Sequence, residues 1–301
     1  MDLGYLTRIV FGTGSIPEGR VLVDPHAHFH RGLEPNDIVE ALLDKGVSAQ
    51  AICDYGLEKG NPEHVISYDE FVGRLNSNSG LEIISSNDTM TKVKRNKNYS
   101  RLILFSGIEM EAEVEGSHGG LLHARHMMHI VVHGMKPTYD YAEEILKRAK
   151  NEHKPATIAH PFTIPARKVE FVYANEEERD TVVRLAKKYG AALEALNGTN
   201  SLWMTPTNFW VREVGLRNNL KLVYSSDAHA RESLELTREQ VGIAGTTIEK
   251  RFFDKAWNEG RFWGMHNAMR YNGQPFGAVQ SPALFYRVMI APRLQRMLNG
   301  E

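Results

Sequence analysis

Residues 20–28 read Arg-Val-Leu-Val-Asp-Pro-His-Ala-His, a short apolar run that ends in an acid and two histidines. A run of this length and composition is typical of a buried strand. In an extended chain, residues two apart face the same side, so His26 and His28 share one face about 6.6 Å apart along the strand. Two imidazoles on one face can hold one metal ion, or they can form a polar strand end that faces solvent.

Six further apolar runs follow the first one along the chain, at residues 48–53, 101–108, 129–133, 156–159, 191–196 and 220–225. Helical patterns or long connections separate these runs, with helices expected at residues 37–45, 67–75, 139–152, 176–189 and 207–218. The alternation predicts parallel strands and an α/β architecture. Seven units favour a closed or nearly closed barrel over a doubly wound sheet.

Composition agrees with a globular protein of this class. The chain has 301 residues, of which 42% are hydrophobic and 24% charged, a balance typical of soluble domains. The length suits one large barrel domain. With 36 basic and 37 acidic residues, the net charge of −1 argues against a surface built mainly for nucleic acid or acidic lipid. Cys53 is the single cysteine, which excludes an intrachain disulfide and a cysteine-only zinc site.

Membrane and export signals are not apparent in the sequence. No apolar run approaches the ~18 residues of a membrane span. The segment 1–5, Met-Asp-Leu-Gly-Tyr, lacks the basic-then-apolar order of a signal peptide. We therefore expect a cytoplasmic protein without a membrane partner; the sequence leaves its oligomeric state open.

The last part of the chain departs from the strand–helix alternation. We interpret residues 1–235 as the barrel domain and residues 236–301 as a C-terminal extension packed on the barrel or lidding it. Within the extension, helices are expected near 249–259 and 283–298. The Gly- and Asn-rich stretch 265–277 between them is a candidate lid or oligomer contact.

Acids and imidazoles collect where the predicted strands end. Asp227 and His229 follow the last run with the same two-residue spacing, and His160, Glu109 and Asp54 follow three other runs. In a parallel barrel those ends converge on the functional face. Burying unpaired His, Asp and Glu side by side is expensive, and metal ions would pair them. A mixed imidazole–carboxylate set suits a divalent transition metal.

In combination these motifs resemble a known family. Asp-Pro-His-Ala-His at 24–28, Asp54, Glu109, His160-Pro161 and Ser-Asp-Ala-His at 226–229 appear in the order seen in the PHP (polymerase and histidinol phosphatase) superfamily. The resemblance spans roughly residues 20–230. It implies a distorted (β/α)7 barrel, similar to a TIM barrel, that binds two or three metal ions and hydrolyses phosphate esters.

Carried over by position, the resemblance implies ligands for each ion. For the first ion these ligands are His26, His28, Glu109 and Asp227. A second ion would share Glu109 and add His160 and one histidine of the run 129–133. A third ion would take His229 and Glu34, six residues after His28.

The histidine of the run 129–133 is left open by the sequence. The order His-Ile-Val-Val-His resembles the family's strand and favours His129. Position near the carboxyl end of the strand favours His133. The two residues share a face but lie about 13 Å apart, so they can hardly bind one ion together.

The chain departs from the family pattern after its second strand. Many members read Thr-Asp-His there, with the histidine as a metal ligand, whereas this chain reads Cys53-Asp54-Tyr55. Tyrosine is a poor neutral ligand, so the third site is either empty or uses Asp54 or Glu58. Glu194 and Asn197 resemble the family's Glu-X-X-Asn strand end, and they either orient metal ligands or cap a loop.

The resemblance implies a metal-dependent phosphoesterase that uses manganese, iron or zinc on a small phosphorylated substrate. Two ions sharing Glu109 would lower the pKa of water from about 15.7 to about 7, so that a metal-bridged hydroxide attacks phosphorus. Arg167 would offset phosphoryl charge, and His229, if free of metal, would protonate the leaving alkoxide. The alternatives are a nuclease acting on nucleic-acid ends and a non-catalytic, metal-stabilised scaffold, which Tyr55 keeps open.

Overall fold

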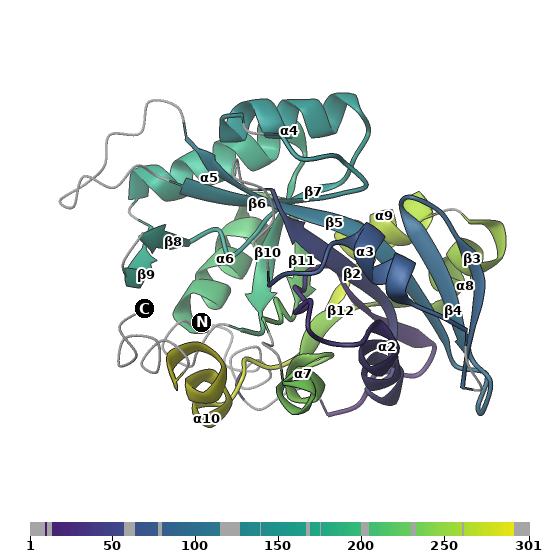
Figure 1. The fold of residues 1–301 in the computed structure, drawn as a ribbon. Coiled ribbons are helices and arrows are strands. Elements are labelled where there is room, and N and C mark those ends of the chain that lie inside the picture. The colour runs from purple at the N-terminus through teal and green to yellow at the C-terminus, as the bar shows by residue number, and fades with distance from the viewer. Residues whose placement is uncertain are drawn as a thin grey trace.

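The computed structural model describes residues 10, 14–56, 64–77, 80–114, 127–138, 140–166, 169–174, 176–199, 205–229, 233–260 and 262–291 (Figure 1). Within these ranges, no helix combines the length and the apolar character needed to cross a bilayer.

A mixed sheet curls into a nearly closed barrel at the centre of the molecule (Figure 1). Its strands follow the spatial order β11-β10-β7-β6-β5-β2-β1-β12-β13. In chain order they are β1 (Arg20–Asp24), β2 (Val47–Tyr55), β5 (Arg101–Glu113), β6 (Met127–His133), β7 (Ala156–Ile158), β10 (Ala192–Asn197), β11 (Lys221–Ser225), β12 (Ala244–Glu249) and β13 (Gln274–Gly277). The first seven are the seven strands that the sequence predicts, and the distorted TIM-like barrel is confirmed.

Strands β11 and β12 are joined by hydrogen bonds of one side chain, Thr246. The Thr246 hydroxyl accepts from the Tyr224 amide (2.9 Å) and donates to the Tyr224 carbonyl (2.8 Å). Just beyond the strands, Ala27 and Ala228 form an isolated parallel bridge. The segments that follow β1 and β11, which carry the predicted His and Asp ligands, are therefore held side by side.

The expectation that all seven strands are parallel is wrong at β6. This strand runs antiparallel to both β5 and β7, whereas the pairs β1–β2, β2–β5, β7–β10 and β10–β11 are parallel. Antiparallel neighbours need no helical crossover, and the sequence between β5 and β6 shows no helical periodicity. The beginning of β6, not its end, therefore lies where the parallel strands end.

Two hairpins accompany the barrel. β3 (Leu81–Ser86) and β4 (Met90–Arg95) pair with each other, and β4 also pairs with β5. β8 (Thr163–Ala166) and β9 (Val169–Tyr173) form a separate two-stranded sheet directly after the residues that follow β7.

Helices lie around the sheet because each has an apolar face to bury. In chain order they are α2 (Pro35–Asp44), α3 (Tyr68–Arg74), α4 (Ala142–Asn151), α5 (Glu176–Tyr189), α6 (Thr205–Arg217), α7 (Leu234–Gln240), α8 (Lys250–Glu259), α9 (Phe262–Asn272), α10 (Pro282–Phe285) and the π-helical turn η2 (Tyr286–Ile290). The predicted capping box is present, with the Ser67 hydroxyl accepting from the Glu70 amide at 3.1 Å. Asn36 was predicted to cap α2, and this is wrong: the helix begins at Pro35, so Asn36 lies inside it and Glu34 is at the cap position.

Part of the C-terminal segment continues the main sheet. β12 pairs with β1 and β13 pairs with β12. The stretch 265–277 forms most of α9 and all of β13, and Met265, His266 and Met269 are buried. The expectation of a lid there is therefore wrong; the boundary at 235 stays a prediction.

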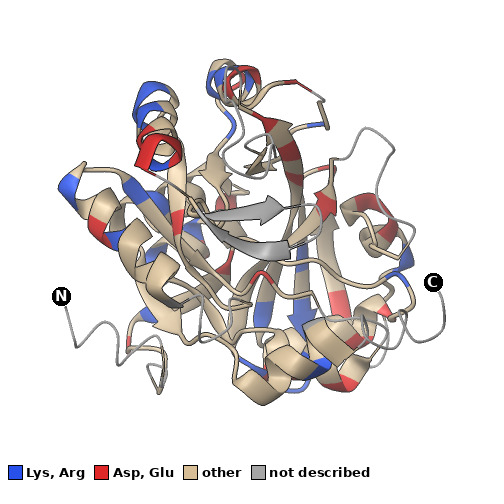
Figure 2. Cartoon of the chain, turned by 90° about the vertical axis from the view of Figure 1, so that its left-hand side faces the viewer, with Lys and Arg blue, Asp and Glu red and all other residues tan. Residues whose placement is uncertain are grey.

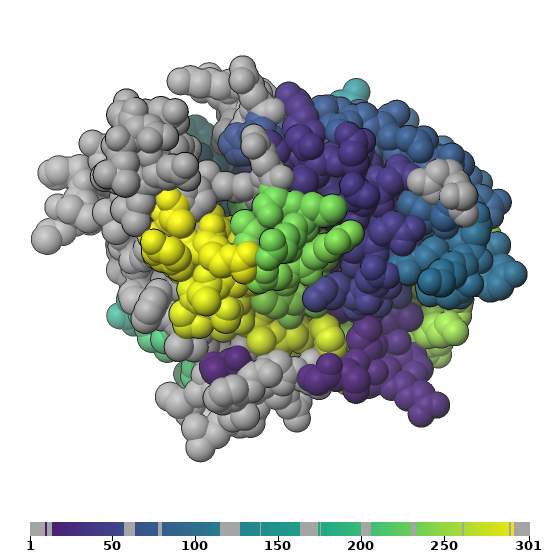
Figure 3. All heavy atoms as spheres, turned by 60° about the horizontal axis from the view of Figure 1, so that its bottom comes forward, coloured from purple at the N-terminus to yellow at the C-terminus, as the bar shows by residue number. Residues whose placement is uncertain are grey.

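The last described helices lie against α7, and Figure 3 shows the yellow C-terminal atoms beside the green atoms of α7. Arg287 in η2 pairs with Glu239 at 2.7 Å and with Glu235 at 3.1 Å, both on α7. These ion pairs join the described end of the chain to α7.

Candidate metal centre

His26 and His28, which follow β1, direct their Nε2 atoms toward each other. His28 Nδ1 donates to the Cys53 carbonyl at 2.9 Å, and His26 Nδ1 donates to Glu194 Oε1 at 3.0 Å. The two Nε2 atoms lie 3.1 Å apart, and both rings are buried. With the proton of each neutral ring on Nδ1, two lone pairs face each other, an arrangement that a shared cation would relieve.

Charges around this pair have opposite effects on its two members. Burial lowers the pKa of His26, but the charges of Asp227, Glu109 and Glu194 outweigh burial and raise that pKa well above its usual value. Burial lowers the pKa of His28 to about 4. In the absence of a metal, the negative field therefore places a positive charge on His26 and leaves His28 neutral.

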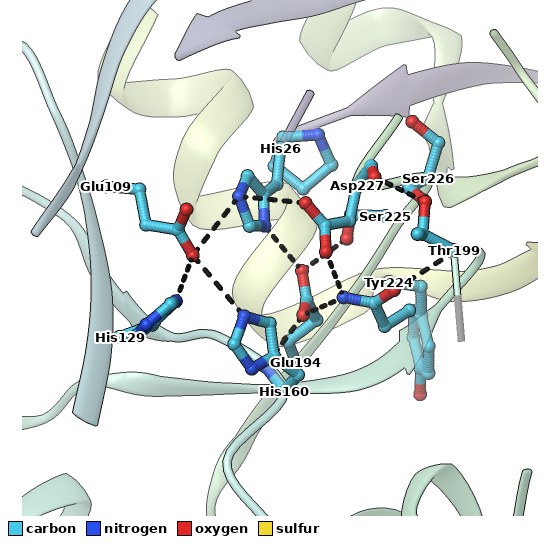
Figure 4. A network of polar contacts seen from close by, with 12 residues as sticks. His26, Glu109, His129, His160, Glu194, Thr199, Tyr224, Ser225, Ser226 and Asp227 are labelled. Carbon is cyan, nitrogen blue, oxygen red and sulfur yellow. Dashed lines mark hydrogen bonds and ion pairs between the residues drawn. The ribbon is translucent and has the colours of Figure 1, made fainter. Parts of the chain in front are cut away.

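Glu109 on β5 lies between two sets of histidines (Figure 4). Its Oε2 is 3.1 Å from His28 Nε2. Its Oε1 is 2.9 Å from His129 Nδ1 and 3.4 Å from His160 Nε2. Burial raises the pKa of Glu109, but the charges of His129 and His26 outweigh it and hold that pKa well below its usual value. An ionised carboxylate in this position can bridge two cations.

The structure separates the two histidines of β6 that the sequence left open. His129, near the start of this antiparallel strand, contacts Glu109, and its buried Nε2 makes no hydrogen bond within the described part of the chain. His133 lies elsewhere: its Nε2 donates to the Pro25 carbonyl at 2.8 Å and its Nδ1 accepts from His266 Nε2 at 2.6 Å. The geometry brings His129 into the cluster and leaves His133 out.

Asp227 follows β11 and offers a free oxygen to the cluster. Its Oδ1 is buried, lies 3.3 Å from His26 Nε2 and makes no hydrogen bond within the described residues. Its Oδ2 accepts from Asn197 Nδ2 at 2.7 Å. Asp227 and His160 have φ values of 48° and 28°, a left-handed conformation that is rare and costly for residues other than glycine. Two of the five described non-glycine residues with positive φ are therefore candidate ligands.

Glu194 on β10 orients ligands from two strands. Its Oε1 accepts from His26 and from the Ser225 hydroxyl. Its Oε2 accepts from the His160 amide at 2.8 Å and from Asn197 Nδ2 at 2.9 Å. Of the two roles considered for Glu194 and Asn197, the contacts favour orientation of ligands. The contact of Ser225 with Glu194 was not identified from the sequence; the position of Ser225 at the end of a buried strand was the available signal.

Tyr55 is hydrogen-bonded to His229, one of the residues expected to bind a third ion. Its hydroxyl donates to His229 Nε2 at 2.6 Å, and its ring stacks on that of His28 with centroids 4.1 Å apart. His229 Nδ1 donates to the Asp227 carbonyl at 2.7 Å. Both ring nitrogens of His229 are therefore engaged by the protein.

The other residues considered for a third ion lie outside this group. Glu34 pairs with Arg74 at 3.2 Å, and Asp54 accepts from the Tyr68 amide at 3.1 Å. Burial raises the pKa of Asp54 to about 7. Glu58 and Arg167 lie outside the described residues.

Ligand atoms gather in three overlapping groups among the described residues, each within 4.8 Å. The groups are His26, His28 and Glu109; Glu109, His129 and His160; and His28, Asp227 and His229. The first two share Glu109, and each has an acceptor atom close by that no protein donor satisfies. Nitrogen and carboxylate donors in this arrangement fit divalent transition-metal ions.

Comparison with known proteins finds similar folds among solved structures. No family model and no curated protein matches the chain. Among solved structures, PsfC from Pseudomonas syringae is 11% identical, with a TM-score of 0.52 over 93% of this chain and 99% of that one. A two-domain protein from Bacteroides vulgatus containing a predicted PHP-like metal-dependent phosphoesterase is 14% identical, with a TM-score of 0.47 over 87% and 67% of the two chains.

The lesion-specific endonuclease EndoQ from Pyrococcus furiosus also matches at 14% identity and a TM-score of 0.47, over 85% of this chain and 57% of that one. At these identities the likeness is one of fold. The barrel fold that the sequence resemblance implies is present in the structure.

Proposed function

We propose that this chain, PHP-like in its fold, is a metal-dependent phosphoesterase acting on a small phosphorylated substrate. The observation that carries the proposal is the position of Glu109, an ionised carboxylate whose two oxygens face different histidines. His26, His28 and Asp227 would hold one divalent ion on one side of it, and His129 and His160 would hold a second ion on the other. When bound, such ions supply Lewis acidity toward a phosphate ester and acidify water.

A purely structural cluster explains these contacts less well. Burying several carboxylates and imidazoles together costs free energy unless each is paired, yet Asp227 Oδ1 and His129 Nε2 have no hydrogen-bond partner in the described part of the chain. Strain at Asp227 and His160 adds to that cost. Both costs are accounted for if the side chains are arranged to bind cations.

The surrounding residues fix the orientation of the ligands. Glu194 and the Cys53 carbonyl hold the Nδ1 protons of His26 and His28, so each ring presents Nε2 to an ion. His229 is partly exposed, and we assign it to protonate the leaving alkoxide; for this, its Nε2, which accepts from Tyr55, would have to gain a proton and turn toward the substrate. Arg167, as the sequence suggests, remains our candidate for offsetting phosphoryl charge.

The charge distribution favours a small substrate over nucleic acid. Figure 2 shows Lys/Arg and Asp/Glu segments interspersed over the chain, in keeping with the net charge of −1. Nucleic-acid binding proteins commonly have a basic stripe that follows the phosphate backbone. We therefore place a phosphomonoester first among candidate substrates.

The test combines elemental analysis with turnover of p-nitrophenyl phosphate and bis-p-nitrophenyl phosphate. Wild type is expected to hold two transition-metal ions per chain and to prefer the monoester. Glu109→Gln is expected to lose at least one ion and more than about 100-fold in turnover, beyond what removing an outer-shell partner of a ligand costs. The matched control, Glu82→Gln, changes an exposed carboxylate on β3 and should behave as wild type.

Each other outcome has a definite meaning. Unchanged metal content and turnover in Glu109→Gln would contradict the proposed centre. Preference for the diester would move the substrate toward nucleic acid. Metal binding without hydrolysis of either ester would support the non-catalytic scaffold.

A further inference from the structure

A cavity of about 520 Å³ lies at the end of the barrel opposite the candidate metal centre. Its wall includes Ala156, Ala191 and Lys221, which lie at the beginnings of β7, β10 and β11. His160 and Asp227, in contrast, follow the ends of β7 and β11. The cavity is therefore separate from the metal cluster and has no part in the function proposed above.

Basic side chains dominate the polar lining of this cavity. They come from helices α4, α5 and α9, from the connection before β7 and from the start of β11: Lys150, Lys154, Lys187, Lys188, Lys221 and Arg270. The wall also includes the aromatic residues Tyr189 and Trp263. No aspartate or glutamate is among the lining residues of the described chain.

Few of these charges are neutralised by the protein. Lys188 Nζ is 2.6 Å from Glu143 Oε1. The other five cations form no ion pair with a carboxylate of the described residues, and the lysines among them contact neutral groups instead. These contacts are Lys150 with the Lys188 carbonyl (3.0 Å), Lys187 with Asn218 Oδ1 (2.7 Å), Lys221 with the Gly190 carbonyl (3.1 Å) and Lys154 with the Trp263 ring (5.4 Å).

Arg270 on α9 is partly buried. One of its terminal nitrogens donates to the Gly190 carbonyl. Its Nε is buried and has no hydrogen-bond partner within the described chain. An unpartnered guanidinium nitrogen in a concave, cationic site costs free energy, and an anion in the cavity would reduce that cost.

The dipoles of neighbouring helices offset only part of the positive charge in the cavity. The C-terminal ends of α4, α5 and α9 are at the cavity, and each carries roughly half a negative charge, about 1.5 in all. Against five cations without a carboxylate partner, an excess of about 3.5 positive charges remains. A phosphate monoester group carries about two negative charges near neutral pH, so one such group does not balance this excess.

We propose that this cavity binds a small anion that carries two or more phosphate groups. Lysine ammonium groups and the planar arginine fork are the usual partners of phosphate oxygens. The volume is within the range of about 300–1,000 Å³ that holds small ligands, and it leaves room for an organic part beside Tyr189 and Trp263.

The probe for this proposal is inorganic pyrophosphate, titrated by calorimetry into purified full-length protein at constant ionic strength. The pocket variant Lys154→Gln/Lys187→Gln removes two unpaired charges without touching Arg270. The matched control Lys45→Gln/Lys97→Gln removes two exposed lysines far from the cavity in sequence. We expect the control to bind as wild type does and the pocket variant to bind at least tenfold more weakly.

Equal affinity in the two double variants would overturn the proposal, as would pyrophosphate binding no better than sulfate. Because pyrophosphate can also bind metal ions, Glu109→Gln is measured in parallel and is expected to keep the pocket affinity. Loss of binding in Glu109→Gln, with none in the pocket variant, would assign the anion to the metal centre instead. Lys221→Gln provides a second pocket variant should the first fail to fold.

Discussion

His26 Nε2 and His28 Nε2 lie 3.1 Å apart, and the Nδ1 atom of each ring is already bound to another acceptor. Without a metal, the contact between the two Nε2 atoms requires one additional proton. The surrounding carboxylates raise the pKa of His26 and so favour that proton on His26. A divalent ion can replace that proton and the repulsion together. The close contact therefore links metal binding to the stability of the fold.

Metal removal should destabilise the protein measurably. At a free ion concentration 100 times Kd, binding to the folded state adds about 2.7 kcal/mol. For a chain of 301 residues, with an unfolding entropy of about 0.6 kcal/mol/K, that free energy corresponds to a rise in Tm of about 4 °C. Thermal unfolding with EDTA and then with manganese or zinc measures the shift, and His28→Ala should abolish most of it. Identical Tm values with and without metal would rule out the link.

Glu194→Gln tests a residue that positions a ligand. Glu194 accepts from His26 Nδ1, so its charge favours the tautomer and orientation that present Nε2. We expect metal affinity to fall by about 10–100-fold, with turnover recovering at excess metal, as is usual for outer-shell partners. Competition with a fluorescent chelator gives the affinity, and Glu235→Gln on exposed α7 is the control. Turnover that stays low at saturating metal would instead assign Glu194 a direct part in the chemistry.

Tyr55 predicts how many ions the centre holds. Its hydroxyl engages His229 Nε2, the nitrogen a third ion would need. Replacing it by Tyr55→His supplies an imidazole at that place, so we expect the ion count at saturating metal to rise from two toward three. Tyr55→Phe removes the hydroxyl without adding a ligand and should keep two ions while changing the pH profile of turnover. Three ions per chain in wild type would contradict this account.

Much of the fold and part of the site could be predicted from the sequence. Each of the seven apolar runs ends in a polar residue or is followed by one, and parallel neighbours carry such positions to one face. The direction of β6 could not be predicted, because a run such as 129–133 looks the same in either orientation. That direction decides between His129 and His133, so the choice of ligand required the structure.

Contacts between segments that are distant in the sequence could also not be predicted. The hydrogen bond between Tyr55 and His229 joins residues 174 positions apart. The basic cavity is built from separate helices and strand starts, and each of its lysines alone has the pattern of an ordinary solvated charge. Only the closure of the barrel brings such residues together, which local propensity and periodicity do not encode.

The buried pair His133 and His266 predicts how stability depends on pH. Burial lowers the pKa of His133 to about 4 from its usual 6.5, and burial also lowers the pKa of His266 well below that value. In the unfolded chain these histidines therefore bind protons below about pH 6.5. In the folded chain His133 stays neutral down to about pH 4. Because the unfolded state binds more protons in this window, the free energy of unfolding falls as the pH drops through it.

The expected loss from His133 alone is at most about 3 kcal/mol between pH 6.5 and 4. Urea unfolding in the presence of EDTA, at intervals between pH 7.5 and 4, measures it without interference from metal release. The double variant His133→Asn/His266→Gln should show a flatter profile than wild type, although it is less stable at pH 7.5. The control His64→Gln, which changes an exposed histidine, should keep the wild-type slope. A double variant whose profile runs parallel to that of wild type would show that other groups cause the loss in acid.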